Sequence, residues 1–542
     1  MKYRQLIGIG SILLALCFSS CDNYLDLEPK DGVTKEKFWK TKEEVKDAVM
    51  GCYAEMMTTD NMKSFFLWGE LRGELIKPNP RSTNAEYLKV QNGDISSAMG
   101  VCSWAGAYRV INNCNTVLHF AKAVQKNDPS FTDNLLAEYE AEAICVRALM
   151  YFYLVRTFRD VPYVIEPSLD DDQDYRIAKT DGMSILADLV NQLRQVDRTE
   201  NGTGTGIPLS YPNTRETKGR FTVWGLKALL ADIYLWMEEY EKCIAQCAQI
   251  MASGQFTLIP VQSTEVEIED LFGNITKVYY PSEGDADNLF LNAYVQGNSV
   301  ESILELQFGT DYENPFWTFF DAASGNFVAN PEVVSSFDLF LPSQVDGGWY
   351  DIRGEGVGYK QGAVWKWLGL SRGGFTARIR GESFSNWIFY RLSDILLMRA
   401  EALTQVEKNT GDVSKLEEAL ELVRTIRSRA CAPESTDMML DQTTLEAPVL
   451  EEFILKERAR EFAHEGKRWF DVLRNAKRNQ YQGMDHLMNL AMYAPSPDKS
   501  LSLQNKWKGD TNSHYLPIHE EELRKNNQLI QNPFYDVETT NK

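Results

Sequence analysis

The feature that most constrains this chain is a pair of helical patterns joined by a very short turn. The segment "FTVWGLKALLADIYLWMEEYEKCIAQCAQIMASGQF" spans residues 221–256, and its apolar positions recur every three or four residues on either side of Met237–Glu239. A helix with an apolar stripe must bury that stripe, and a second helix a few residues away is the nearest partner. The segment therefore predicts a packed helix pair.

The spacing within this pair resembles a tetratricopeptide unit. Small Ala231 precedes Tyr234 by three positions, and such small residues let two helices approach closely while large ones fill the space between them. Lys227 stands where these units usually carry tryptophan, so the match is partial. Cys243 and Cys247 lie one helical turn apart, and we interpret them as small core residues rather than as a metal or redox pair.

Further helical patterns run along most of the chain. Thr41 and Glu44 form a capping box, and helices are predicted at about residues 41–56, 102–124, 134–158 and 183–196. Later, "NWIFYRLSDILLMRAEAL" precedes "KLEEALELVRTIRSRA", and "LEEFILKERAREFAHEG" precedes "KRWFDVLRNAKRN". The predicted fold class is mostly α, with tetratricopeptide-like helix pairs forming a right-handed helical scaffold.

One long region differs from the rest. Residues 255–385 are rich in Gly, Asn and aromatic side chains, show few helical periods, and include short strand candidates such as "SILELQF". Because compact domains seldom carry such a stretch without a function, we interpret it as a loop-rich subdomain with a few short strands. At 542 residues the chain exceeds one ordinary core. The expected parts are a signal peptide (1–20), an N-terminal helical region (21–225), a helix pair plus the loop-rich subdomain (226–385) and a C-terminal helical region (386–542).

The N-terminus has the pattern of a lipoprotein signal. Lys2 and Arg4 precede an apolar run over residues 6–18, which is too short to cross a bilayer core of roughly 30 Å. Two serines and then Cys21 follow, which resembles a bacterial lipobox whose cysteine becomes the lipidated N-terminus. The acidic residues just after Cys21 resemble a signal for export to the cell surface. The alternative is an ordinary secreted protein cleaved near the same place.

The charge balance and motifs argue against several functions. The chain has 77 Asp and Glu against 56 Lys and Arg, which disfavours nucleic acid and anionic lipid surfaces as partners. The HExxH and P-loop motifs do not occur. His464 and Glu465 are predicted to lie on the surface. If the chain were a glycosidase, which needs two nearby carboxylates, Asp311, Glu313 and Asp321 would be the candidates.

The loop-rich region suits sugar binding better than catalysis. Aromatic planes can cover the apolar face of a sugar ring, while Asp, Asn and Arg bond to its hydroxyl rim. For any single ring the alternative is packing inside the loops. The candidate ligand-binding residues in this region are Tyr312, Asn314, Phe316, Trp317, Asp321, Trp349, Tyr350, Trp365 and Trp367.

Six segments in order together resemble the SusD/RagB family, surface lipoproteins that partner a TonB-dependent outer-membrane transporter. They are "CDNYLDLEP", "AEAICVRALMYFYLVRTFRDVPYV", "YRLSDILLMRAEAL", "IRSRA", "ERAREFAHEGKRWFDVLR" and "YLPIHEEELRKNNQLIQNPFY". The resemblance implies a non-catalytic protein without a cofactor or metal that captures glycans and passes them to a SusC-like transporter. A peptide-binding RagB-like protein, a lipid-anchored glycoside hydrolase and a scaffold that binds only protein remain alternatives.

The resemblance also indicates a second candidate region, without assigning ligand contacts residue by residue. The segment "LWGELRGELIKPNPRSTNAEY" lies in a region that supplies ligand contacts in starch-binding relatives, and its candidates are Trp68, Arg72, Glu74 and Tyr87. We expect the charged residues of the matching helices to form pairs that hold the helices together: Arg147, Arg399, Glu401, Glu457, Arg458 and Arg460. We assign Trp104, Trp224 and Trp469 to the core.

Overall fold

Most of the chain folds into packed helices. The structure is a computed structural model that describes residues 38–169, 174–269, 273, 275–281, 285–309, 313–321, 324–331, 333, 351–354, 359–360, 363–369, 378–382, 384–432 and 445–536. Helices account for 61% of it, and the strands are short. The predicted mostly helical class is confirmed. No helix in these ranges is both long enough and apolar enough to cross a membrane.

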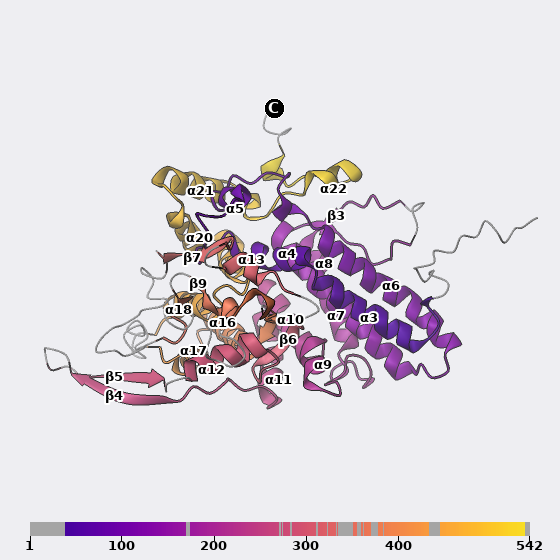
Figure 1. The fold of residues 1–542 in the computed structure, drawn as a ribbon, viewed down its shortest axis with the longest axis horizontal. Helices are drawn as coiled ribbons and strands as arrows, with labels where there is room; N and C mark the ends of the chain where they lie inside the picture. Colours follow the sequence, from indigo (N-terminus) through magenta and orange to yellow (C-terminus); the bar gives the residue numbers. More distant parts are fainter. Residues whose placement is uncertain are drawn as a thin grey trace, which may run out of the picture.

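The N-terminal helices form one layer. In Figure 1, α3, α6 and α7 lie side by side, and α8 packs on α7. Thr41 caps the first helix through the predicted capping box with Glu44. The predicted helices of this layer are confirmed. The bounds are α3 (Lys42–Met56), α4 (Thr59–Glu70), α5 (Ala85–Gln91), α6 (Ala105–Asn127), α7 (Asp133–Phe158), α8 (Gly182–Val196) and α9 (Thr214–Gly219).

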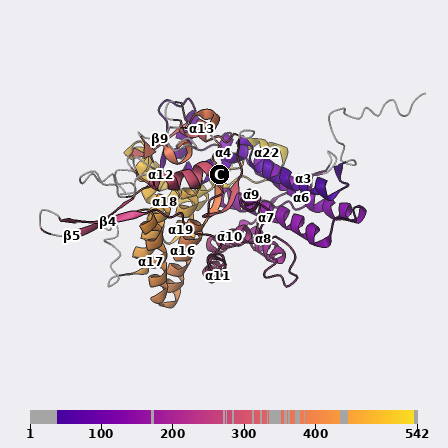
Figure 2. The ribbon, with the colours of Figure 1, turned by 60° about the horizontal axis from the view of Figure 1, so that its bottom comes forward.

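Helix pairs form the other half of the scaffold. α10 packs on α11, α11 on α16, and α16 on both α17 and α18, as Figure 2 shows from below. Cys243 and Cys247 are fully buried, as predicted for small core residues. The handedness of the scaffold stays a prediction. The bounds are α10 (Val223–Trp236), α11 (Tyr240–Ala252), α16 (Leu392–Thr410), α17 (Ser414–Arg429), α18 (Ala447–Glu461) and α19 (Arg468–Tyr481).

The strands of the described chain form two-stranded pairs. β6 (Ser302–Leu306), which was predicted, pairs antiparallel with β10 (Trp387–Arg391). The prediction that "NWIFYRL" belongs to a helix is wrong, because every residue of β10 is buried, and four aromatic or β-branched residues in a row suit a strand covered on both faces. The other pairs are β1 (Ile76–Pro78) with β7 (Phe327–Ala329), β2 (Val161–Pro162) with β3 (Lys179–Thr180), β4 (Ser263–Glu269) with β5 (Ile275–Pro281), and β8 (Tyr359–Lys360) with β9 (Ala363–Val364).

Shorter elements surround this frame. The β4–β5 hairpin extends away from the body in both ribbon views (Figures 1 and 2). A π-helix spans Leu291–Gln296. The remaining α-helices are α12 (Asp285–Phe290), α13 (Phe316–Phe320), α15 (Trp365–Leu368), α20 (Asp485–Leu490), α21 (Pro497–Gly509) and α22 (Glu520–Lys525).

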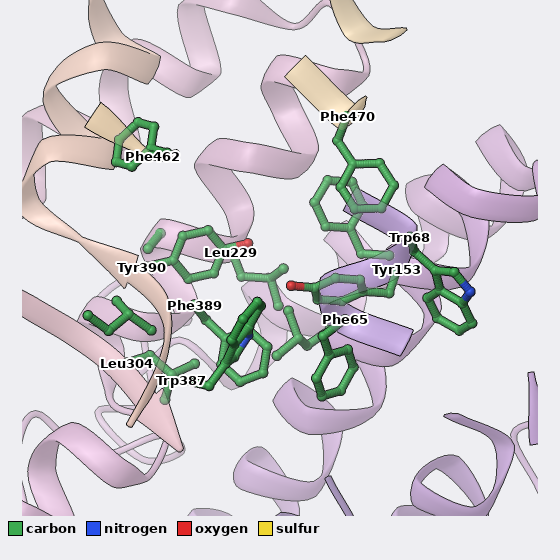
Figure 3. Packing of buried hydrophobic residues seen from close by; sticks show 14 of the residues in the cluster. Phe65, Trp68, Tyr153, Leu229, Leu304, Trp387, Phe389, Tyr390, Phe462 and Phe470 are labelled. Carbon is green, nitrogen blue, oxygen red and sulfur yellow. The ribbon is translucent and has the colours of Figure 1, made fainter. Parts of the chain in front are cut away.

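Aromatic side chains from distant parts of the sequence meet in the core. Figure 3 shows Phe65, Tyr153, Phe389 and Phe470 converging from four different elements. The ring centroid of Phe65 lies 4.9 Å from that of Tyr153 and 5.5 Å from that of Phe389. The ring centroids of Tyr153 and Phe470 are 6.0 Å apart. Leu229 of α10 and Leu304 of β6 belong to the same cluster, so the N-terminal, middle and C-terminal regions share one core.

The end of α4 is held by the turn before α19, an arrangement we call the α4 seat. The Glu70 carboxylate accepts hydrogen bonds from the backbone N–H groups of His464 and Gly466, at 3.0 and 3.1 Å. A Cβ at Gly69 would lie 1.6 Å from the carbonyl oxygen of Gly466, so only glycine fits there. The predicted surface position of His464 and Glu465 is wrong. Both are buried, because this turn is enclosed by α4.

Buried charges surround α18. Glu457 and Glu461 on this helix are at most 3% exposed and are surrounded by arginines. We call this group the α18 ionic cluster, and its members are Glu301, Asp351, Arg353, Lys366, Arg391, Arg427, Arg429, Glu457, Arg460, Glu461 and Glu465. Buried ions of one sign are costly without partners, so the cluster ties the surrounding elements to α18.

The paired charges implied by the resemblance are found with one exception. Arg399 pairs with Glu418, Glu401 with Arg474, and Arg458 with Asp471. Glu457 and Arg460 pair with each other inside the α18 ionic cluster. Arg147 instead bonds two amides, donating to Asn115 and Gln192 at 2.7 Å each. Trp104 and Trp469 lie in the core as expected, and Trp224 is partly buried.

Candidate functional site

A groove beside the N-terminal half of α6 has the size and lining of a ligand site. We call it the α6 groove. Its large chamber has a volume of about 680 Å³ and lies between α6, residues 162–168 and 175–177, and α22. Its small chamber has a volume of about 280 Å³ and lies between α6, α4 and α5. Ala105 and Arg109 line both chambers, so the chambers adjoin there.

Amide side chains of α6 fix the wall of the large chamber. Asn112 accepts a hydrogen bond from the Ser168 backbone N–H at 2.7 Å, and Asn115 donates to the carbonyl oxygens of Val164 and Glu166 at 3.1 Å each. On the opposite side, Asn526 donates to the carbonyl of Ile177 at 2.8 Å. A wall held in this way is preorganised, which reduces the entropy lost when a ligand binds.

Aromatic side chains supply the apolar part of the large chamber. Tyr108 donates its hydroxyl to the carbonyl of Pro162 at 2.7 Å, and burial raises the pKa of Tyr108 well above its usual value, so it stays a donor. Trp104 is nearly buried at the floor, whereas Tyr175 is 41% exposed at the rim. The chamber thus combines ring surfaces with amides, the pairing that sugar rings need.

Arg109 lies where the chambers meet. Its Nε donates to Glu55 at 2.7 Å, and its guanidinium lies 3.8 Å from the carboxylate of Asp60. Because the side chain is half exposed, this pair adds little stability, and the guanidinium is accessible to a ligand. A ligand long enough to occupy both chambers would pass over Arg109.

Polar and charged side chains also line the groove on both sides of Arg109. Asn113, Lys525 and Glu522 line the large chamber, and Lys63 and Ser64 line the small one. Positive and negative groups occur together, so the groove does not select strongly for one sign of charge. Groups of both signs can bond to hydroxyls or amides of a neutral ligand.

Among the aromatic candidates of the loop-rich region whose side chains the structure describes, Phe316 and Trp367 lie in the core. Phe316 is fully buried and stacks on Trp367 at a centroid distance of 4.2 Å. Asn314 is also buried and donates to the carbonyl of Ser385 at 2.6 Å. Trp317 is partly buried, and Asp321 accepts hydrogen bonds from Ser324. These contacts give the buried rings a packing role, and their ligand role stays a prediction.

The N-terminal candidates are also buried. Trp68 donates its indole N–H to the carbonyl of Val101 at 2.8 Å, and Arg72 donates to the carbonyl of His514 at 2.6 Å. Glu74 accepts a bidentate hydrogen bond from Arg468. Tyr87 alone among these four lines the α6 groove, in the small chamber, although only 6% of it is exposed.

Some predictions cannot be compared with the structure. Tyr312, Trp349, Tyr350, Cys21 and the carboxylate candidate Asp311 lie outside the described residues, as does the side chain of Trp365. Within the described ranges, no group of three or more His, Cys, Asp or Glu is placed to hold a metal ion.

The groove residues Tyr108, Asn112, Asn113 and Tyr175 were missed from sequence. One signal was available: "INNCN" places three asparagines inside a 23-residue helix. Asparagine disfavours helix interiors, so such a group indicates that the amides have side-chain partners or face a ligand. Tyr175 follows a segment without periodicity, and nothing in the sequence indicates that this segment packs beside α6.

Comparisons with known proteins agree with the fold. A family model described as "SusD family" matches residues 373–535, and one described as "Starch-binding associating with outer membrane" matches residues 23–235. SusD-like protein P38 of Formosa agariphila is 25% identical over 518 residues, which cover 89% of this chain and 93% of that protein. A SusD-like protein of Bacteroides ovatus is 22% identical over a match that covers 94% of this chain and 86% of that protein. A SusD superfamily structure from Bacteroides vulgatus has a TM-score of 0.66 at 17% identity, and the match covers 92% of this chain and 100% of that one.

The fold and these matches define a class of large, mostly helical proteins associated with the outer membrane. The matches indicate no enzyme family. Both family models belong to one group of relatives, and together they extend over the N-terminal and C-terminal regions that share the core. SusD family models thus match two separate parts of the chain, and SusD-like proteins are similar to it along most of its length.

Proposed function

We propose that this protein is a lipid-anchored, surface-exposed lipoprotein that binds oligosaccharides without cleaving them and delivers them to a SusC-like TonB-dependent transporter. Cys21 is the proposed lipidation site. The observation that supports ligand capture most directly is the α6 groove, with tyrosines and asparagines in a chamber of about 680 Å³. That volume suits two or more sugar rings.

Calorimetric titration of the mature protein with a glycan panel tests the carbohydrate part. We expect dissociation constants between about 1 mM and 1 μM for the cognate glycan. Tyr175→Ala, at the exposed rim, should weaken binding about tenfold because one stacking surface is lost. Leu501→Ala, an equally mild change at a 59% exposed apolar residue outside the groove lining, should leave binding unchanged.

The outcomes separate the alternatives. No binding to any glycan together with binding to a peptide panel would favour a RagB-like peptide-capture protein. Release of reducing ends from a polysaccharide, abolished by one carboxylate substitution, would establish a glycoside hydrolase instead. Binding to neither glycans nor peptides would favour a scaffold that binds only protein.

Anchoring and partnership require cellular tests. Labelling with radioactive palmitate should mark the wild-type chain but not Cys21→Ala, and protease added to intact cells should digest the wild type. Purification of the protein from solubilised outer membranes should recover a TonB-dependent barrel. Loss of palmitate labelling in the wild type would refute the lipid anchor, and absence of a barrel would refute the partnership.

A further inference from the structure

The two chambers of the α6 groove adjoin along one face of α6. Ala105 and Arg109, which line both chambers, are four positions apart and therefore neighbours on that face. Arg109 donates to Glu55 in the wall of the large chamber and lies 3.8 Å from Asp60 in the wall of the small one. Because its side chain is half exposed, a ligand that extends from one chamber into the other contacts the guanidinium.

The chambers differ in the surfaces that they offer to a sugar. Trp104, Tyr108 and Tyr175 line the large chamber, and Tyr175 is the ring with the most exposed surface. The ring that lines the small chamber is Tyr87, of which only 6% is exposed. A sugar in the large chamber can therefore stack on an aromatic side chain, whereas a sugar in the small chamber must be held by hydrogen bonds.

The small chamber has polar groups available for such hydrogen bonds. Within the described part of the chain, the Lys63 amine in its wall has no hydrogen-bond or ion-pair partner. The Ser64 hydroxyl donates to the carbonyl of Asp60 at 3.0 Å and keeps its lone pairs for a ligand donor. Helix α6 begins without a side-chain cap, and Ala105 and Gly106 of its first turn line the chamber, so backbone N–H groups add further donors.

The charges of the small chamber balance one another. Lys63 and Arg109 line it together with Asp60 and Glu86, and Glu86 also accepts a hydrogen bond from the Val101 backbone N–H at 3.0 Å. An anionic group would find no excess of positive charge there. A neutral ring that carries hydroxyls uses the same donors and acceptors without bringing a charge out of water.

We propose that the two chambers form one continuous site for a neutral oligosaccharide longer than a disaccharide. Its stacked rings lie in the large chamber, and a further ring lies in the small chamber with hydrogen bonds to Lys63 and Ser64. This inference rests on the proposed function and adds the length of the ligand and the residues that select for it. The small chamber, with about 280 Å³, is just below the usual size of a small-molecule pocket and suits a single ring. Since that ring is linked to those already bound, its contacts add affinity without a second loss of translational freedom.

Calorimetry with oligosaccharides of graded length tests the proposal. The probes are the disaccharide to the hexasaccharide of each polysaccharide in the glycan panel, with starch, xylan, mannan and β-glucan among them. For a glycan that binds, affinity should rise about tenfold at the length that first reaches the small chamber, because about two hydrogen bonds are gained, and should stay constant for longer chains.

The outcomes distinguish this inference from the proposed function. Equal affinity at all lengths, or a rise that continues with every added ring, would overturn the inference and leave glycan capture intact. No binding at any length would refute glycan capture and the inference with it.

Two variants and a control locate the step in affinity. Lys63→Met removes the unpaired amine from the small chamber and should reduce the tenfold step to about threefold or less. Tyr175→Ala should weaken the binding of short and long chains by the same factor and so retain the step. Lys508→Met changes an exposed lysine of α21 outside both chambers and should leave all affinities unchanged. A full step in Lys63→Met would overturn the proposal.

Crystals of the wild-type protein soaked with the longest chain that binds give a test that does not depend on the variants. Electron density for the sugar should continue from the large chamber past Arg109 into the small one. Density confined to the large chamber would overturn the proposal even if Lys63→Met does not fold.

Discussion

Replacement of Glu461 by glutamine tests whether the α18 ionic cluster stabilises the fold. One carboxylate oxygen of Glu461 accepts from Arg391 at 2.5 Å and from Arg429, and the other accepts from Arg353 at 3.0 Å. Glutamine preserves the shape of the side chain but removes its charge. Three buried arginines would then lose an anion that they share.

The structure sets the size of the effect. Each arginine keeps another carboxylate: Arg391 keeps Glu465, Arg429 keeps Glu301, and Arg353 keeps Asp351 and Glu457. The loss is therefore that of one partner from a buried network, about 3–5 kcal/mol of unfolding free energy, rather than three times that amount. At a slope of about 3 kcal/mol per M, the urea midpoint should fall by roughly 1–1.7 M.

Urea unfolding followed by tryptophan fluorescence measures this change. Glu452→Gln is the matched control, because Glu452 pairs on the surface of the same helix with Lys456 at 2.7 Å and should contribute at most about 1 kcal/mol. If Glu461→Gln costs less than about 1 kcal/mol, or no more than Glu452→Gln, the buried cluster is not a source of stability and the reasoning fails.

The difference between wild type and Glu461→Gln should also depend on pH. Burial raises the pKa of Glu461, but Arg429, Arg391 and Arg353 outweigh it and hold the pKa well below the usual 4.5. A lowered pKa in the folded state gives stability that is fully present above the unfolded value and is lost as pH falls toward the folded value. The difference should be constant near pH 7 and shrink below about pH 4.5.

Three other substitutions test the packing. Gly69→Ala should destabilise the protein by more than about 3 kcal/mol in urea unfolding, because the added methyl group would overlap the Gly466 carbonyl. Gly51→Ala is the control: a Cβ there would have no atom within 4 Å, so the change should stabilise the protein by about 0.5–1 kcal/mol. Equal effects of the two substitutions would contradict the α4 seat. Thr41→Ala should cost about 1 kcal/mol in the same assay, and no change would mean that the capping box does not hold α3. Trp367→Ala should cost about 3–5 kcal/mol and leave glycan affinity unchanged in calorimetry below the melting temperature, while weaker binding would assign this ring to the ligand site.

The helices could be predicted well from the sequence. The periodic pattern and the Thr41 capping box are local, so they locate α3 without knowledge of its neighbours. β10 is the counterexample. Its five residues are too few to show a period, and their strand conformation depends on pairing with β6, far away in the sequence.

The candidate site was harder to predict for a related reason. A tryptophan such as Trp367 has the same composition signal whether it faces a sugar or stacks on Phe316, and the difference is a contact between distant loops. The α6 groove likewise depends on how the segments around Pro162 and Asn526 pack beside α6. Neither the asparagines of that helix nor the walls opposite them were predicted from the sequence.

The α4 seat has a consequence for how the molecule folds. Glu70 and the backbone N–H of His464 are 394 positions apart, so a growing polypeptide completes α4 long before the loop that receives it exists. Contacts of such long sequence separation slow folding and leave apolar helix faces unprotected meanwhile. A truncated product ending before His464 should therefore depend on chaperones and be degraded rapidly, even though it contains every residue of α3, α6, α7 and α8.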